Sequence, residues 1–154
     1  MRFLIVSVGR PRDRALSEAI HEYETRAARY WPLETKEVRE EPARSTPPAL
    51  VREREGQRLL DACDGADVIA CDAAGPQMAS EEFAGWMREK RERGERDLAF
   101  LIGGAFGLSE GVRSRARSSL GLSRWTLPHE LARLVLAEQL YRAGTIVRGE
   151  PYHK

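Results

Sequence analysis

The sequence has little of several features that mark common functional classes. Its 154 residues contain only two cysteines, Cys63 and Cys71, which lack the paired spacing of a zinc site. No apolar run approaches the roughly 20 residues of a membrane-spanning helix, and Phe3–Val8 is too short and wrongly flanked for a signal peptide. We therefore expect a cytoplasmic protein with no membrane segment and no bound metal.

Neither charge sign nor nucleotide motifs stand out. Lys and Arg number 25 against 24 Asp and Glu, so no global positive field draws the protein to nucleic acid, and any RNA contact must come from a local patch. The chain has no GxGxxG fingerprint, no GxxxxGK[ST] phosphate loop and no GxSxG elbow. Dinucleotide binding, nucleotide hydrolysis and serine hydrolysis therefore lose their usual support.

The hydrophobic pattern predicts one α/β domain over residues 1–154. A hydrophobic content of 42% is enough for one core. Short apolar runs alternate with helical patterns, which is typical of a parallel sheet covered by helices. Pro47-Pro48 precedes one helix, and Ser80 is the expected N-cap of another. The predicted strands are Phe3–Val8, Leu33–Val38, Val68–Cys71, Leu98–Ile102 and Leu122–Leu127.

A glycine-rich segment follows the fourth predicted strand, where open α/β sheets bind their ligands. In IGGAFGLSE, Gly103-Gly104 permits a tight turn and close approach to a ligand, Gly107 permits a second bend, and Ser109 is placed to cap a helix. Such a loop suits a nucleoside. A Gly-Gly pair taken alone is nevertheless more often a purely structural turn.

A long amphipathic helix is predicted after Pro128, which stops the preceding strand. His129 in its first turn is either a general base or, more commonly, a hydrogen-bonding structural residue. Arg133 and Arg142 lie beside the apolar stripe, so each must extend to solvent, pair with a carboxylate or face an interface. The residues expected in the core are Leu134, Val135 and Leu140.

The C-terminal sequence RGEPYHK combines an aromatic ring, an imidazole and two cations in seven residues. Tyrosine can stack on a base, and lysine or arginine can hold a phosphate, so this composition suits RNA. Terminal residues are usually frayed, and the tail alone is weak evidence.

Three features together, GG-x-x-G-L-S, TLPHELARLVLAEQLYRA and the PYHK ending, resemble the RlmH family of 23S ribosomal RNA methyltransferases. The opening MRFLIVSVGRPRDRALSEAIHEYETRAARY is similar to that family's first strand and helix, so the resemblance spans essentially the whole chain. It implies a SPOUT-type α/β fold with a C-terminal trefoil knot. It also implies a homodimer that transfers a methyl group from S-adenosylmethionine to N3 of a pseudouridine in 23S rRNA of the assembled ribosome.

The resemblance implies cofactor-binding residues, and we add a hypothesis for residues that act on the nucleotide. Arg142 would orient the base or stabilise developing charge, Tyr152 and His153 would position the nucleotide, and Lys154 would contact RNA phosphate. Because N3 is a poor nucleophile while protonated, Arg142, His153 and Lys154 are the candidates for assisting proton loss. The cofactor-binding positions, contacted mainly through the backbone, are Cys71, Gly103, Leu122, Ser123, Arg124, Trp125, Thr126 and Leu127.

The sequence departs from the family pattern at three positions. Cys71 replaces a usual leucine, Pro76 stands where a lysine often follows Gly75, and Gly144 replaces a common tryptophan. Two alternatives stay open: a SPOUT enzyme acting on another RNA, and a ribosome-associated binding protein with a degenerate, non-catalytic site.

Overall fold

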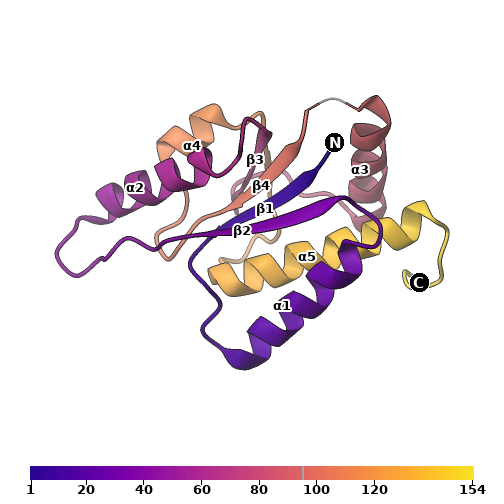
Figure 1. The fold of residues 1–154 in the computed structure, drawn as a ribbon, viewed down its shortest axis with the longest axis horizontal. Coiled ribbons are helices and arrows are strands. Elements are labelled where there is room, and N and C mark those ends of the chain that lie inside the picture. The colour runs from indigo at the N-terminus through magenta and orange to yellow at the C-terminus, as the bar shows by residue number, and fades with distance from the viewer. Residues whose placement is uncertain (95) are drawn as a thin grey trace.

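A five-stranded parallel sheet forms the middle layer of the protein (Figure 1). The computed structural model describes residues 1–94 and 96–154. The strand order is β2-β1-β4-β3-β5, and every neighbouring pair is parallel. This architecture confirms the predicted α/β class. The strands are β1 (Phe3–Val8), β2 (Leu33–Val38), β3 (Asp67–Cys71), β4 (Leu98–Ile102) and β5 (Ser118–Leu120).

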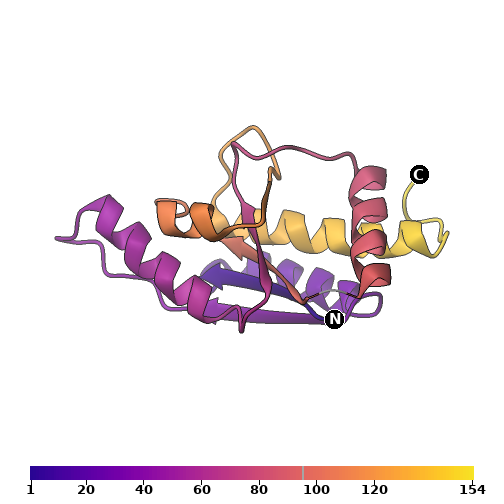
Figure 2. The same ribbon diagram turned by 90° about the horizontal axis from the view of Figure 1, so that it is seen from above.

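Helices cover both faces of the sheet because its central strands are apolar on both sides. Along β1, Phe3 and Ile5 belong to one core cluster while Leu4 and Val6 belong to the other. The first cluster packs against α1 (Arg14–Ala27), α3 (Ser80–Arg93) and α5 (His129–Val147). The second packs against α2 (Pro48–Asp61) and α4 (Glu110–Arg115), on the opposite face (Figures 1 and 2).

The predicted strand at Leu122–Leu127 is wrong. Those residues form a loop, and the fifth strand is β5, which lies at the sheet edge and pairs only with β3. Polar residues interrupt the apolar run, and Pro128 limits it, so its leucines face a pocket instead of a sheet. The knot implied for this C-terminal region stays a prediction.

Two helix starts were predicted from serine residues, and one of them is correct. Ser109 caps α4, because its Oγ accepts a hydrogen bond of 3.2 Å from the Val112 N–H. Ser80 instead lies inside α3, where its hydroxyl donates to Gln139 Oε1 at 2.8 Å. The Ala79 N–H is satisfied by the carboxylate of Glu82, at 2.7 Å.

The buried stripe of α5 differs from the predicted one by a small rotation of the helix. Leu140 is fully buried as predicted, but Leu134 and Val135 are half-buried and lie outside the stripe. The buried positions of α5 recur every three or four residues, so they lie on one face of the helix. The buried residues of α5 are Arg133, Leu136, Ala137, Leu140, Ala143, Gly144 and Thr145.

Arg133 pairs with carboxylates, which was one of the three alternatives for it. Its Nε donates to Glu24 Oε1 at 2.7 Å, and its Nη1 lies 3.3 Å from Glu37 Oε1. Burial acts to lower the pKa of Arg133, yet hydrogen bonding and charge attraction from these two acids raise it overall. The ion pair joins α5 to α1 and to β2. No helix within residues 1–94 and 96–154 is long and apolar enough to cross a membrane.

Candidate active site

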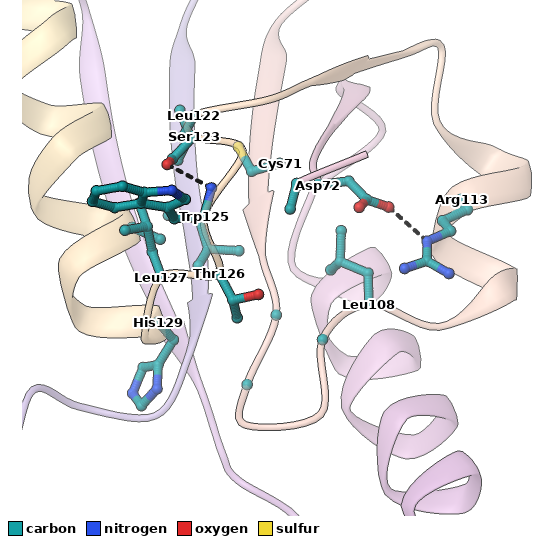
Figure 3. Close-up of a pocket in the computed structure, with 16 residues that line it drawn as sticks. Cys71, Asp72, Leu108, Arg113, Leu122, Ser123, Trp125, Thr126, Leu127 and His129 are labelled. Atoms are coloured by element: carbon teal, nitrogen blue, oxygen red, sulfur yellow. Dashed lines mark hydrogen bonds and ion pairs between the residues drawn. The ribbon is translucent and has the colours of Figure 1, made fainter. Parts of the chain in front are cut away.

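A pocket lies at the carboxyl ends of β3 and β4 (Figure 3). Seven of the eight predicted cofactor positions line it, whereas Arg124 is exposed and outside the lining. The seven are Cys71, Gly103, Leu122, Ser123, Trp125, Thr126 and Leu127. The loops after β3, β4 and β5 therefore meet around one cavity, as expected for an open α/β sheet.

The turn after β4 requires glycine at Gly103 and Gly107 because of the backbone. A Cβ on Gly103 would lie 2.6 Å from the carbonyl carbon of Gly107, closer than real side chains permit. Gly107 has φ of +81°, and its N–H donates to the Gly104 carbonyl at 3.0 Å. The structural interpretation of this turn is therefore correct, and the same turn presents bare backbone to the pocket.

The loops after β3 and β5 also touch backbone to backbone. The Gly121 N–H donates to the Pro76 carbonyl at 2.9 Å, and a Cβ on Gly121 would lie 2.4 Å from the Gly75 carbonyl oxygen. Gly121 was not among the predicted site residues, although it directly precedes Leu122. Any residue at position 76 supplies this carbonyl, so proline in place of lysine leaves the contact intact.

One wall of the pocket is charged and another is neutral. Asp72 and Arg113 form an ion pair at 2.7 Å, and neither was predicted as a site residue. Burial raises the pKa of the Cys71 thiol to about 12, so the thiol stays neutral near pH 7 and serves as a small apolar wall. The Ser123 Oγ accepts the Trp125 N–H at 3.0 Å and stiffens the loop between them.

Two aromatic side chains mark the rim of the pocket. The Trp125 side chain is exposed, and it lies on the opposite side of the pocket from Asp72 and Arg113 (Figure 3). His129 also lines the pocket, and its buried Nε2 has no hydrogen-bond partner in the described parts of the chain. The structural hydrogen bond expected for His129 is therefore missing at Nε2.

A second cluster, centred on Glu138, brings together the three predicted catalytic residues. Glu138 Oε1 accepts hydrogen bonds from Arg142 at 2.6 Å and from the Tyr152 hydroxyl at 3.1 Å. The Arg142 guanidinium lies 3.1 Å from His153 Nδ1 and 4.9 Å from the centre of the Tyr152 ring. Glu138 was treated only as part of the helical repeat, and its central position was missed.

The ionisation of this cluster is set by its neighbours. Burial and hydrogen bonding raise the pKa of Tyr152, while the Glu138 hydrogen bond raises that of Arg142, so both keep their protons near neutral pH. His153 Nε2 lies 2.7 Å from Glu81 on α3, and this hydrogen bond lowers the pKa of Glu81. Lys154 follows the cluster and is exposed.

The pocket lies at the start of α5, whereas Arg142 lies in the second half of this helix and Tyr152 and His153 lie in the tail after it. His129 lines the pocket, and Arg142 follows it by 13 residues on the same helix. At 1.5 Å of rise per residue, the backbones of His129 and Arg142 are about 20 Å apart along the helix axis. Arg142, Tyr152 and His153 are not among the residues that line the pocket in one copy of the chain.

Comparisons with known proteins identify the family. The model of the family described as predicted SPOUT methyltransferase matches residues 1–153. Two relatives, both named ribosomal RNA large subunit methyltransferase H, match over 100% of both chains: one from Gemmatimonas aurantiaca at 56% identity and one from Anaeromyxobacter sp. at 48%. A probable methylase family protein from Haemophilus influenzae shares the fold, with a TM-score of 0.58 and 14% identity over 99% of this chain and 70% of its own. The chain therefore belongs to the ribosomal RNA large subunit methyltransferase H (RlmH) family of SPOUT methyltransferases.

Proposed function

We propose that this protein methylates 23S rRNA of the assembled ribosome in the cytoplasm. The methyl group passes from S-adenosylmethionine to N3 of a pseudouridine. The observation that carries the proposal is the presence, in a chain of this family, of a glycine-built pocket and a separate cluster of Arg142, Tyr152 and His153 around Glu138. The full-length match to relatives named as ribosomal RNA methyltransferases supports rRNA as the substrate.

The pocket fits S-adenosylmethionine in size and chemistry. It encloses about 690 Å³ with the space at its mouth included, within the usual range for small-molecule sites. Leu108, Leu122 and Leu127 offer apolar surface for an adenine ring, while the glycine loops offer backbone groups for the polar atoms. When bound, the cofactor supplies an electrophilic methyl group on its sulfonium.

Arg142, Tyr152 and His153 act on the nucleotide in this proposal. N3 attacks the methyl carbon more readily as its proton leaves, and the Arg142 guanidinium stabilises the negative charge that develops on the base. The Arg142 N–H donates to His153 Nδ1, so the His153 proton is assigned to Nε2, facing Glu81. Both ring nitrogens are thereby oriented, which suits a positioning role for His153. Exposed Lys154 is available for an RNA phosphate.

We also propose that the protein acts as a homodimer with a knotted C-terminal region. Its exposed large apolar side chains, among the described residues, are Phe106, Trp125 and Leu131 at 40%, 82% and 36% exposure. All three lie on or next to segments that line the pocket. A second copy would cover this apolar rim and bring its own Glu138 cluster to the pocket, which closes the gap of about 20 Å.

The direct test is methylation of ribosomes that lack the modification. The purified protein, ribosomes from a strain without the gene and isotope-labelled S-adenosylmethionine are combined, and 23S rRNA nucleosides are analysed by mass spectrometry. We expect labelled N3-methylpseudouridine. Removing residues 152–154 should abolish the label, while calorimetry shows S-adenosylmethionine affinity within about twofold of the intact protein.

Other results would select the alternatives. Label in a different RNA would make the protein a SPOUT enzyme with another substrate. Failure to bind S-adenosylmethionine in calorimetry would instead indicate a ribosome-binding protein with a degenerate site. Full activity without residues 152–154 would remove the tail from the mechanism.

A further inference from the structure

Tyr30, just after α1, is bonded to the C-terminal segment across 120 residues of sequence. Its hydroxyl donates to Glu150 Oε2 at 2.5 Å. The Arg148 guanidinium lies 4.5 Å from the centre of the Tyr30 ring and donates to the Arg29 carbonyl at 3.1 Å. The end of α1 thus holds the chain immediately before Pro151 and Tyr152.

The absence of a side chain at Gly144 leaves room for the Tyr30 ring. A Cβ on Gly144 would lie 2.4 Å from Cβ and Cγ of Tyr30, so the ring rests directly on the backbone of α5. Glycine inside a helix costs about 1 kcal/mol relative to alanine. A larger side chain at position 144, such as the tryptophan common in the family pattern, would occupy the space that Tyr30 fills.

The C-terminal segment turns back at a well-defined point. Gly149 has φ of +69°, and its N–H donates to the Ile146 carbonyl at 3.0 Å. The Glu150 N–H donates to the Thr145 carbonyl at 2.8 Å. This pair of bonds is a Schellman motif, which ends the helix and fixes the direction of the chain. The Tyr30 bond then holds the side chain of Glu150, the first residue after the turn.

Tyr30 also reaches Tyr152 through an aromatic row. The ring centres of Tyr30 and Tyr141 are 5.8 Å apart, and those of Tyr141 and Tyr152 are 4.6 Å apart. Tyr152 is therefore held from two directions, through the chain from Glu150 and through the ring of Tyr141, which is tilted against it.

We propose that Tyr30 is a positioning residue, which holds the segment from Glu150 to His153 in the orientation that methyl transfer requires. This inference rests on the proposed function, in which Tyr152 and His153 meet the nucleotide. Gly144 is needed for this positioning role, because only glycine leaves room for the Tyr30 ring on α5.

The test is Tyr30→Phe, which keeps the ring and removes only the hydroxyl. With ribosomes as substrate, we expect kcat to fall about five- to tenfold, which corresponds to the net effect of one typical hydrogen bond. The KM for ribosomes, the S-adenosylmethionine affinity and the Tm should stay close to those of the unchanged protein. A residue that only stabilised the fold would lower the Tm and leave kcat unchanged.

A double-mutant cycle shows whether Tyr30 acts through Glu150. Glu150→Ala should match Tyr30→Phe in kcat, and the double variant should be no slower than either single variant. Glu150→Gln keeps an acceptor oxygen and should recover most of the rate. Glu18→Gln removes an exposed carboxylate that accepts from Arg14 on the same helix, and serves as the control.

The outcomes separate this inference from the proposed function. If the unchanged protein labels no 23S rRNA, the proposed function fails first. If it labels 23S rRNA and Tyr30→Phe does so at the same kcat, the positioning role of Tyr30 is refuted. Additive losses in the double variant would likewise refute the route through Glu150.

Discussion

Glu55 on α2 is a carboxylate that the fold buries without a full set of partners. It is 4% exposed, and its Oε2 accepts the Glu41 N–H at 3.1 Å. Its buried Oε1 has no hydrogen-bond partner in the described residues. Burial raises the pKa of Glu55, the neighbouring charges of Glu40 and Glu41 add to this, and the Glu41 N–H and Arg58 oppose it.

A raised carboxyl pKa makes stability fall as pH rises. Above the unperturbed value of 4.5, the folded protein holds a proton at Glu55 that the unfolded chain has released. The contribution of Glu55 to stability is therefore greatest below pH 4.5 and is lost as pH rises through the folded pKa of Glu55. We expect Glu55→Gln to remove this decline, on the order of 1 kcal/mol, in urea unfolding measured between pH 4 and pH 8. Glu53→Gln changes an exposed acid on the same helix and should leave the decline in place. Equal slopes for the Glu55 variant and the unchanged protein would contradict the expectation.

At the scale of elements, the sequence pattern predicted the fully buried strands β1 and β4, the edge strand β2 and the strand β3. The ranges of β1, β2 and β4 were predicted to the residue, and that of β3 to within one. The short strand β5 was missed because Ser118 and Ser119 are polar, and it is held by long-range pairing with β3, which local sequence does not record. A strand was wrongly predicted at Leu122–Leu127 because the apolar side chains of Leu122 and Leu127, which line the pocket, resemble those of a buried strand.

The candidate site was predicted where residue type and family pattern agreed. Arg142, Tyr152 and His153 indeed gather in one cluster. Glu138 was missed because a glutamate four residues before an arginine looks like an ordinary helix-surface pair. Its second partner, Tyr152, comes from a chain reversal at Gly149 that periodicity does not reveal.

The backbone contact between the loops after β3 and β5 predicts that position 121 requires glycine. In Gly121→Ala the new methyl would meet the Gly75 carbonyl oxygen, and backbone atoms have no rotamer with which to move aside. We expect the unfolding free energy to fall by about 1–3 kcal/mol and S-adenosylmethionine binding to weaken, measured by urea unfolding and calorimetry.

A glycine-to-alanine change elsewhere in the chain tests whether the loss of stability comes from the contact between these two loops. A Cβ on Gly85, within α3, meets nothing within 4 Å. Gly85→Ala should therefore stabilise the protein by up to about 1 kcal/mol, since alanine is the better helix former. Equal destabilisation by Gly121→Ala and Gly85→Ala would mean that the contact between the two loops does not require glycine at position 121.

For the whole molecule, the distance between pocket and Glu138 cluster predicts that two copies share each active site. About 20 Å of α5 separates the two groups within one chain, and both are needed for the proposed reaction. A variant without residues 152–154 keeps its pocket. Gly103→Ala keeps its tail, but its new methyl would press on the Gly107 carbonyl. Each variant should be inactive by itself.

Heterodimers of these two variants test the sharing directly. The variants carry different affinity tags, are produced together and are purified through both tags. One of the two sites then combines an intact pocket with an intact tail, while the other combines both defects. We expect about half of the unchanged protein's methylation rate per dimer, measured as label entering 23S rRNA. A heterodimer as inactive as its parents would show that each tail serves the pocket of its own chain. Failure of the tags to purify together would exclude the dimer itself.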